Sequence, residues 1–305
     1  MTLRQERRIA AYGVCRDDAG RVLLVQSSPT SGSSGSWNLP GGGLDHGEDP
    51  AVAVAREFLE ETGLVVKVTG LHSVSIEVND VPHLGIRRHQ DQIMYDVRVV
   101  GGHLTPEVDG SSHRVEWLSE AQIEGLPLFD RVRTTLGVTG LPELRNPNPP
   151  VSTPEEPDPD RGQRFSAYGV VTDPAGRILL TLISENYPGA GTWHLPGGGT
   201  DFGEDSADGV LRELREETGQ TGRITQLLTV SNMHNPAAWG PEGRAMDWHG
   251  VRVTYRVIID TPTDPVVGEV NGSTAAAGWF TAAEAATLRL NRPTFEALTR
   301  ARLLS

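Results

Sequence analysis

The segment 50–62 contains three glutamates: Glu60 and Glu61 follow Glu57 by three and four residues. On a helix this spacing places all three carboxylates on one face, where their like charges repel one another. A divalent cation that prefers oxygen ligands would remove the repulsion. Bound there, such an ion could stabilise charge on phosphate oxygens and lower the pKa of a water molecule. The spacing therefore predicts a site for a divalent metal ion.

The flanking residues predict the loop and the helix that would position these carboxylates. The segment 39–43, LPGGG, is typical of a turn whose glycines let a ligand approach the backbone. Asp49 is a candidate N-cap, Pro50 is tolerated in a first helical turn, and Gly63 supplies the left-handed residue that ends a helix. The opposite face is expected to pack on a core through Val52, Ala55 and Leu59.

The same stretch occurs twice. Trp193–Gly219 repeats Trp37–Gly63 at an offset of 156 residues, with 18 of the 27 positions identical. The repeat extends beyond this stretch, because the segment 12–14, YGV, recurs at 168–170. A period this long indicates a duplicated domain rather than a solenoid repeat. The second set of acidic residues is Glu213, Glu216 and Glu217.

Taken together, these residues resemble the Nudix box, the signature of the Nudix hydrolase family. The first box consists of Gly42, Glu48, Arg56, Glu57, Glu60, Glu61 and Gly63, and the second of Gly198, Glu204, Arg212, Glu213, Glu216, Glu217 and Gly219. Two positions depart from the pattern: Phe58 stands where the family usually has an aliphatic residue, and Gln220 replaces a hydrophobic one. The alternative, a solvated acidic helix with ordinary caps, requires all the other features to coincide.

The resemblance implies an α/β fold of two tandem α/β/α sandwiches with mixed sheets. It implies that the six glutamates of the two helices bind Mg²⁺ or Mn²⁺ and carry the catalysis, and that Gly42 and Gly198 offer backbone groups to the metal or phosphates. Arg56 and Arg212 would orient a carboxylate, with Glu48 and Glu204 as supports at the helix start. The general base would be a box glutamate or an acid from a later loop. The later acids shared by both halves are Glu107 and Glu269, although surface charges at strand ends are the simpler interpretation of both.

The second helix carries Asp208 and Arg215 where the first has Val52 and Leu59. It is therefore expected to pack on a rotated face, through Ala207, Val210, Leu211 and Leu214. Because its glutamates are retained, chemistry is expected in both halves.

Domain boundaries follow from composition. The segment 142–163 holds seven prolines and several acidic residues, which predicts an extended linker between domains 1–141 and 164–305. Its alternative, a polyproline docking site, lacks aromatic or basic neighbours. In the first domain a hairpin is expected over 8–26, strands at 64–68, 71–78, 92–100 and 116–118, a polar loop at 79–88, and helices after Ser119 and at 128–136.

Two loops offer candidate substrate contacts. Arg87 and Arg88 in the first half could hold a phosphate, although solvated charges are the simpler interpretation. In the second half the segment 232–249 is expected to be a long loop. Its residues Trp239 and Trp248 could stack on a base or could cover a sheet edge or a domain contact.

Composition limits the possible partners and location. The net charge of −13 argues against a broad nucleic-acid interface, and no apolar run reaches the length needed to span a membrane. A single cysteine, Cys15, excludes a disulfide scaffold, and its apolar segment favours a small buried residue over a catalytic thiol. These features predict a cytoplasmic protein with neither nucleic-acid nor membrane partners, and the resemblance implies a small-molecule diphosphate substrate.

Several functions remain open from the sequence. The first is a hydrolase of nucleoside diphosphates linked to another group or of nucleoside triphosphates, and the second is a hydrolase of isoprenyl or other non-nucleotide diphosphates. A third is a ligand-sensing Nudix-like binding protein with one or both sites inactive. Since many family members form homodimers, the duplication could also represent an intramolecular pseudo-dimer.

Overall fold

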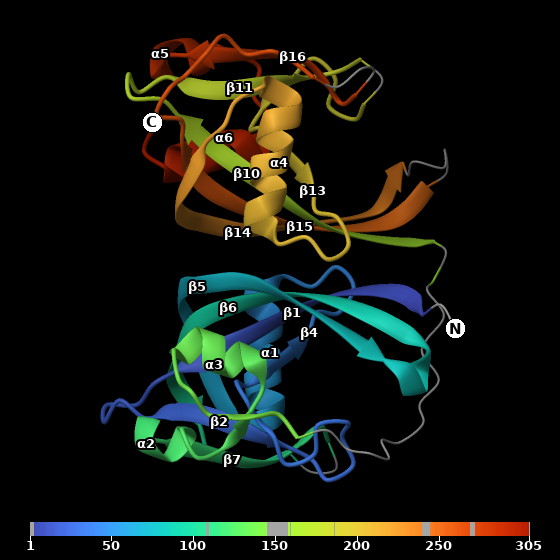
Figure 1. The fold of residues 1–305 in the computed structure, drawn as a ribbon, viewed down its shortest axis with the longest axis vertical. Helices are drawn as coiled ribbons and strands as arrows, with labels where there is room; N and C mark the ends of the chain where they lie inside the picture. The colour runs from blue at the N-terminus through green and yellow to red at the C-terminus, as the bar shows by residue number, and fades with distance from the viewer. Residues whose placement is uncertain are drawn as a thin grey trace. The chain divides into compact units, whose positions relative to one another are not determined.

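A computed structural model describes residues 3–107, 110–144, 158, 160–185, 187–239, 245–268 and 272–304. The chain forms two compact units, one of Met1–Gly162 with His234–Trp248 and one of Gln163–Met233 with His249–Ser305. Of the predicted linker, residues 145–157 and 159 lie outside the described part. Figure 1 follows the chain through both halves. Within the described residues, no helix is long and apolar enough to cross a membrane.

The first domain is built on two mixed sheets. Its strands are β1 (Arg4–Cys15), β2 (Val22–Ser27), β3 (Trp37–Asn38), β4 (Gly41–Gly43), β5 (Leu64–Val81), β6 (Ile86–Gly102), β7 (Ser112–Leu118), β8 (Pro127–Leu128) and β9 (Leu141–Pro142). One sheet has the order β4-β1-β6-β5 and the other β7-β2-β3-β8-β9. Strand β1 runs parallel to β6 and antiparallel to β4, and β3 runs parallel to β8 and antiparallel to β2.

Helices pack against both of these sheets. They are α1 (Pro50–Thr62), the short 3₁₀ helix η1 (Pro82–Leu84), α2 (Glu120–Ile123) and α3 (Asp130–Leu136). Helix α1 contacts β1, β4 and β5, while α3 contacts β3. The predicted α/β fold with mixed sheets is confirmed. The polar loop expected at 79–88 is shorter than predicted, because β5 and β6 continue as a paired ladder in which Asp80 lies opposite Arg87.

The second domain repeats the element order. It contains β10 (Arg161–Thr172), β11 (Ile178–Ile183), β12 (Trp193–His194), β13 (Gly197–Gly199), α4 (Ser206–Thr218), β14 (Arg223–Trp239), β15 (Ala245–Ile258), β16 (Thr274–Phe280), α5 (Ala282–Ala285) and α6 (Arg292–Arg300). The described strands form one sheet, β12-β11-β10-β15-β14, with β13 on β10 and β16 on β11.

The long loop expected at 232–249 is wrong for the described residues, which extend β14 to Trp239 and begin β15 at Ala245. As neighbours in the sheet, these two strands satisfy backbone groups that a loop would leave to water. Strand β14 ends the sheet order, and an edge strand tolerates Pro236 because some of its amides need no partner in the ladder.

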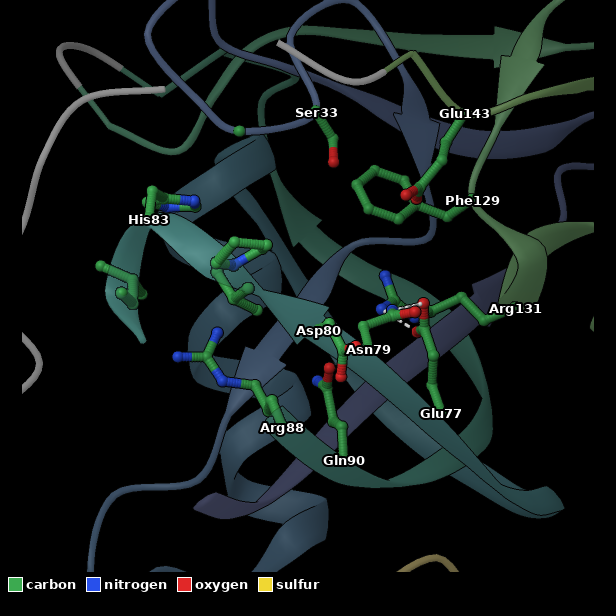
Figure 2. Close-up of a pocket in the computed structure, with 14 residues that line it drawn as sticks. Ser33, Glu77, Asn79, Asp80, His83, Arg88, Gln90, Phe129, Arg131 and Glu143 are labelled. Atoms are coloured by element: carbon green, nitrogen blue, oxygen red, sulfur yellow. Dashed lines mark hydrogen bonds and ion pairs between the residues drawn. The ribbon is translucent and has the colours of Figure 1, made fainter. Parts of the chain in front are cut away.

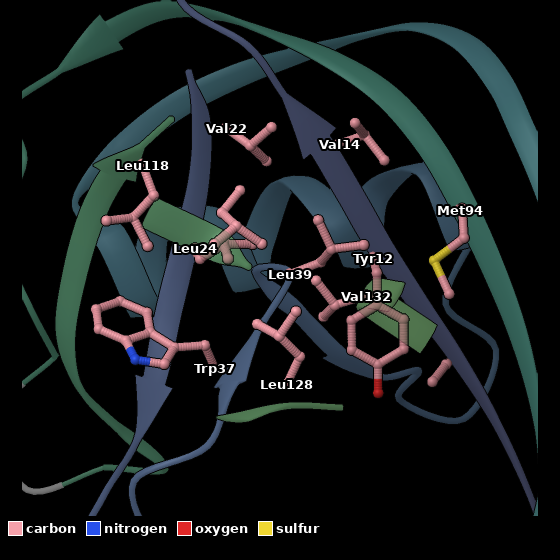
Figure 3. Packing of buried hydrophobic residues seen from close by; sticks show 12 residues of the cluster. Tyr12, Val14, Val22, Leu24, Trp37, Leu39, Met94, Leu118, Leu128 and Val132 are labelled. Carbon is pink, nitrogen blue, oxygen red and sulfur yellow. The ribbon is translucent and has the colours of Figure 1, made fainter. Parts of the chain in front are cut away.

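Each domain has its own hydrophobic core. Figure 3 shows the core of the first domain, where alternate residues of β1 meet β2, β3 and the helices that follow β7. Cys15, the last residue of β1, is buried, and its burial raises the pKa of the thiol to about 11, as expected for a structural residue. The second core consists mainly of Val170, Ile178, Leu180, Leu195, Ala285, Ala297, Leu298 and Ala301.

The buried face of α1 differs from the prediction. Val52 and Leu59 are 58% and 53% exposed, whereas Val54 and Phe58 are fully buried. The difference arises because Glu61 itself points inward, so the residues one and two turns before it form the packed face.

Helix α4 packs on the same face as α1, so the predicted rotation is also wrong. Val210 and Leu214 are buried at positions equivalent to Val54 and Phe58, while Ala207 and Leu211 are only half-buried. The charged residues of α4 that replace Val52 and Leu59 stand on the exposed face, where charge is easily tolerated. They are Asp208 and Arg215.

Candidate active site

Matching caps fix the two acidic helices. The Asp49 carboxylate accepts a hydrogen bond from the Ala51 amide at 2.8 Å, and Gly63 ends α1 with a φ of 70°. Asp205 and Gly219 do the same for α4, with a distance of 2.8 Å and a φ of 69°. These caps satisfy amides and carbonyls that the helix ends leave without partners, so each helix begins and ends at a defined residue.

A glycine in each short strand before the helix makes room for the first glutamate. A Cβ atom placed on Gly42 would lie 2.6 Å from Oε1 of Glu57, and one on Gly198 would lie 2.6 Å from Oε1 of Glu213. Any larger residue would displace the carboxylate. The glycines therefore let a carboxylate lie directly against the backbone, an arrangement in which both can face a ligand.

The last glutamate of each cluster is buried and held by fixed donors. Glu61 accepts a hydrogen bond from the Gly41 amide at 2.9 Å and one from the Ser111 hydroxyl at 3.3 Å. Burial, together with the charges of Glu57 and Glu107, raises the pKa of Glu61 to about 8, although the Gly41 amide opposes the rise.

The second cluster holds its buried glutamate in the same way. Glu217 accepts from the Gly197 amide at 2.9 Å and from the Thr274 hydroxyl at 2.6 Å. The position of both carboxylate oxygens is therefore set by the protein in each half.

One arginine ties the carboxylates of each helix together. Arg56 donates two hydrogen bonds to Glu48, both of 2.9 Å, and single bonds to Glu57 at 3.0 Å and Glu60 at 3.2 Å. It also reaches the Gly43 carbonyl at 3.1 Å. The bonds to Glu48 raise the pKa of Arg56, so its charge is permanent. Arg212 makes the equivalent contacts with Glu204, Glu213, Glu216 and Gly199.

The donor set of each cluster fits a hard divalent cation. Burial raises the pKa of Glu57, and the neighbouring charge of Glu60 adds to the rise although Arg56 opposes it. Glu57 and Glu61 lie next to one another and both resist ionisation, so a bound cation would stabilise their charged forms. Their ligand atoms are all oxygens, which hard divalent cations prefer. Glu60 is more exposed and lies one turn from Arg56.

Of the two later acids considered as general bases, the structure describes only Glu107. Glu107 accepts hydrogen bonds from the amide and hydroxyl of Ser112, at 3.2 and 3.4 Å, and its charge contributes to the raised pKa of Glu61. It therefore lies beside the cluster. Glu269 lies outside the described residues.

Two residue pairs near the clusters were not found by sequence reasoning. Tyr12 pairs with Gly41 across β1 and β4, and Tyr168 pairs with Gly197 across β10 and β13. A guanidinium lies over each ring, from Arg131 in the first half and from Arg252 in the second. The sequence shows both tyrosines at the constant offset, but it does not show that they lie beside the box glycines or which arginines cover them.

A second repeated arginine was also overlooked. A Cβ atom on Gly199 would meet the guanidinium of Arg164 at 2.5 Å, and Arg8 covers Gly43 in the same way. Arg8 acts against the raised pKa of Glu57, so its positive charge is felt at the cluster. Both arginines appear at the offset of 156 residues in the sequence.

Each domain has a cavity beside its repeated tyrosine. In the first, a cavity of about 540 Å³ is lined by Phe129, Arg131, Gln90 and Arg88, among others (Figure 2). Arg88 also donates to Glu6 at 2.7 Å, while Arg87 lies 3.5 Å from Asp80, with both side chains of that pair exposed.

In the second domain a cavity of about 430 Å³ is lined by Tyr168, His194, Gly198, Glu213 and Arg252, among others. It thus reaches the acidic cluster directly. Trp239 is 74% exposed on β14, and Trp248 faces Gly162, whose added Cβ would lie 2.5 Å from the indole ring.

The comparisons with known proteins identify the fold family. The NUDIX domain model matches residues 6–135 and 162–301. RNA pyrophosphohydrolases from Brucella ovis and Rhizobium meliloti are 42% identical over 65 residues and 50% identical over 46 residues. These matches cover 21% and 15% of this chain and 36% and 28% of the relatives, so the chain spans about a third of their length.

Two solved structures are similar to part of the chain. The NUDIX domain of Shewanella oneidensis NrtR complexed with ADP ribose is 22% identical, with a TM-score of 0.39, over 48% of this chain and 92% of that chain. A MutT NUDIX hydrolase from Burkholderia pseudomallei is 28% identical, with a TM-score of 0.37, over 46% and 98%. Because the family model matches nearly the whole of both halves, the chain belongs to the NUDIX domain family and carries two copies of the domain.

Proposed function

We propose that this protein is a divalent-metal-dependent hydrolase that cleaves the diphosphate bond of a nucleoside diphosphate linked to another group, or of a nucleoside triphosphate. The observation that carries the proposal is the pair of buried or half-buried carboxylates in each half, held by backbone amides, hydroxyls and one arginine beside a glycine strand. Relatives that match part of the chain are named RNA pyrophosphohydrolases, which supports a phosphate anhydride as the bond that is broken.

Glu57, Glu60 and Glu61 would hold Mg²⁺ or Mn²⁺ in the first half, with backbone groups of Gly42 nearby, and Glu213, Glu216, Glu217 and Gly198 would do so in the second. When bound, the metal neutralises charge on phosphate oxygens and lowers the pKa of water. The protein's own contribution is preorganisation. Arg56 fixes the orientation of Glu57, and the Gly41 amide and the Ser111 hydroxyl fix that of Glu61.

A proton must leave the attacking water, and Glu107 is a candidate to accept it. It stands outside α1, yet its charge reaches Glu61, and Ser112 orients its carboxylate through two hydrogen bonds. A base must be oriented and close to the reacting group. The bonds from Ser112 and the proximity to Glu61 support Glu107 in this role.

The first cavity is suited to the nucleoside portion of the substrate. Its volume of about 540 Å³ is in the range of pockets that enclose nucleotide-sized ligands. Phe129 offers a ring for stacking, while the side chains of Asn79 and Gln90 offer amide groups for hydrogen bonding at the same cavity (Figure 2). The proposed partner is accordingly a small molecule.

A turnover screen tests this proposal. The full chain is incubated with Mg²⁺ or Mn²⁺ and with nucleoside diphosphate sugars, dinucleoside polyphosphates, nucleoside triphosphates and isoprenyl diphosphates, and products are separated by ion-exchange chromatography. We expect metal-dependent cleavage of at least one nucleotide, abolished by EDTA and restored by added metal. Cleavage of isoprenyl diphosphates alone would refute the nucleotide assignment, and tight binding without cleavage of any compound would indicate a sensor.

A further inference from the structure

The cavities of the two domains, called here the first and second clefts, each contain an arginine on the face of the repeated tyrosine. The two arginines come from different elements. The guanidinium of Arg131 lies 4.8 Å from the ring centroid of Tyr12, and that of Arg252 lies 4.2 Å from the ring centroid of Tyr168. Arg131 comes from α3, whereas Arg252 comes from β15. The positions are therefore not equivalent in the duplicated sequence, although both cations reach the tyrosine beside the box glycines.

In the first cleft this cation is neutralised. Arg131 is only 6% exposed and donates to Glu77 at 2.6 Å (Figure 2). Burial disfavours the charge on Glu77, but Arg131 and the side chains of Asn79 and Gln92 hold the pKa of this carboxyl below its usual range. The pair therefore remains ionised with no net charge, and Arg131 has little positive potential left for an anionic ligand.

In the second cleft the corresponding cation has no such partner. The repeat aligns Arg252 with Gln92, because His89 and Tyr95 correspond to His249 and Tyr255. Within the part of the chain that the structure describes, Arg252 makes no ion pair and no hydrogen bond, and it is half-buried on the face of Tyr168. A half-buried guanidinium in this state attracts anions more strongly than an exposed one, since less water screens its charge.

A second polar group in the same cleft lacks a hydrogen-bond partner. His194, which is 8% exposed, lines the cavity and meets Tyr168 edge to face at a centroid distance of 6.3 Å. Its Nε2 atom is buried without a hydrogen bond among the described residues. Burial and the charge of Arg252 lower the pKa of His194 to about 4, so the imidazole is neutral at pH 7 and can donate one hydrogen bond from Nε2 in the appropriate tautomer.

Among the described residues, the first cleft has no buried, unsatisfied donor at the position equivalent to His194. The residue equivalent to His194 is Asn38, whose side-chain oxygen already accepts hydrogen bonds from the Leu39 amide at 3.0 Å and from Arg131 at 3.3 Å. The second cleft thus combines an unneutralised cation with an unsatisfied donor, and both line a cavity that extends to the metal-binding glutamate Glu213.

We propose that Arg252 and His194 form an anion-binding subsite that holds a phosphate group of the substrate outside the acidic cluster of the second domain. The inference rests on the proposed hydrolase function and specifies its substrate: the second cleft takes the more highly charged polyphosphates, such as nucleoside triphosphates. The first cleft, whose cation is neutralised by Glu77, does not share this preference. The two halves therefore divide substrates by charge.

The subsite is tested first by equilibrium binding without metal. Inorganic tripolyphosphate is titrated into the full chain in EDTA and followed by calorimetry. We expect a site whose affinity falls about tenfold or more in Arg252→Gln, which installs the first-domain residue, and falls less in Arg252→Lys. His194→Asn should weaken binding while leaving the cation in place. Arg223→Gln removes the same charge at the surface and is the matched control.

The second test compares substrates in the second cleft alone. In a chain carrying Glu57→Gln and Glu61→Gln, Arg252→Gln should raise the KM for ATP about tenfold and the KM for ADP-ribose much less, with circular dichroism confirming the fold. Unchanged tripolyphosphate binding in both Arg252→Gln and His194→Asn would overturn the subsite, as would an equal loss in Arg223→Gln. Loss of binding in Arg252→Gln without turnover of any diphosphate would support the subsite and refute the hydrolase proposal.

Discussion

Lowering the pH from about 8 should weaken divalent-metal binding at the first acidic cluster more steeply than it would weaken binding at a site made of exposed carboxylates. Burial, together with the charges of Glu57 and Glu107, raises the pKa of Glu61 from 4.5 to about 8. The folded, metal-free chain therefore keeps a proton on Glu61 at neutral pH. That proton must leave when the carboxylate binds a metal ion.

The size of the effect follows from this pKa. Below pH 8 one proton competes with the metal, so the apparent dissociation constant should rise about tenfold for each pH unit, or about 1.4 kcal/mol. Without metal, the folded state binds more protons than the unfolded state between pH 4.5 and 8. The free energy of unfolding should therefore fall as the pH rises through this window, and bound metal should reverse the loss.

The assay is calorimetric titration with Mn²⁺ of a chain carrying Glu213→Gln and Glu217→Gln, in which only the first cluster is intact. Measurements in two buffers of different ionisation enthalpy give the number of protons released. We expect nearly one proton per ion at about pH 6.5 and almost none above about pH 9. Adding Glu61→Gln should remove this pH dependence. An affinity that is constant between about pH 6 and pH 8, with no proton release, would refute the account of Glu61.

Three further predictions test individual contacts. In Gly42→Ala the new Cβ would stand 2.6 Å from Oε1 of Glu57, so Mn²⁺ affinity at the first cluster should fall at least about tenfold while circular dichroism stays unchanged. By urea unfolding, Phe58→Ala should cost about 3–5 kcal/mol, whereas Leu59→Arg should cost less than about 0.5 kcal/mol. Because the pKa of His194 is depressed to about 4, the parent should lose about 2 kcal/mol between pH 7 and pH 5 that His194→Asn retains.

Each of these expectations has an outcome that contradicts it. Unchanged Mn²⁺ affinity in Gly42→Ala would show that the glycine does not make room for the carboxylate. Equal losses from Phe58→Ala and Leu59→Arg would contradict the assigned buried face. Parallel pH profiles for His194→Asn and its parent would show that this imidazole is not held neutral by its surroundings.

Local features of the candidate site could be predicted from the sequence because they depend on spacing along one helix. The caps Asp49 and Gly63 act within a single turn of their own helix ends, and the structure has both. The glutamate spacing likewise needs only helical geometry to bring carboxylates together. The duplicated domain shows the same caps and glutamate spacing a second time, which strengthened the prediction.

The buried face of α1 could not be predicted from hydrophobicity alone. Val52 and Leu59 are apolar, yet they face solvent, because the inward direction is set by Glu61 and its bond to the Gly41 amide. An apolar stripe normally marks the packed face. Here a buried acid belongs to that face, and a count of apolar residues cannot include it.

Contacts between elements that are distant in the sequence could not be predicted either. Arg131 and Arg252 reach equivalent tyrosines from a helix and from a strand, so neither alignment of the two halves nor periodicity links them. Whether the positive charge is neutralised depends on an ion pair with Glu77, a residue outside both boxes. Only the folded chain shows which cation is neutralised.

The most direct test of the central claim is the steady-state turnover of the parent chain, Glu61→Gln, Glu217→Gln and the double variant, on a diphosphate that the parent cleaves in Mg²⁺. If each acidic cluster supports hydrolysis, each single variant should lose the turnover of its own half. The double variant should fall about 10²-fold or more. A double variant that cleaves the same compound at the parent rate would contradict the account.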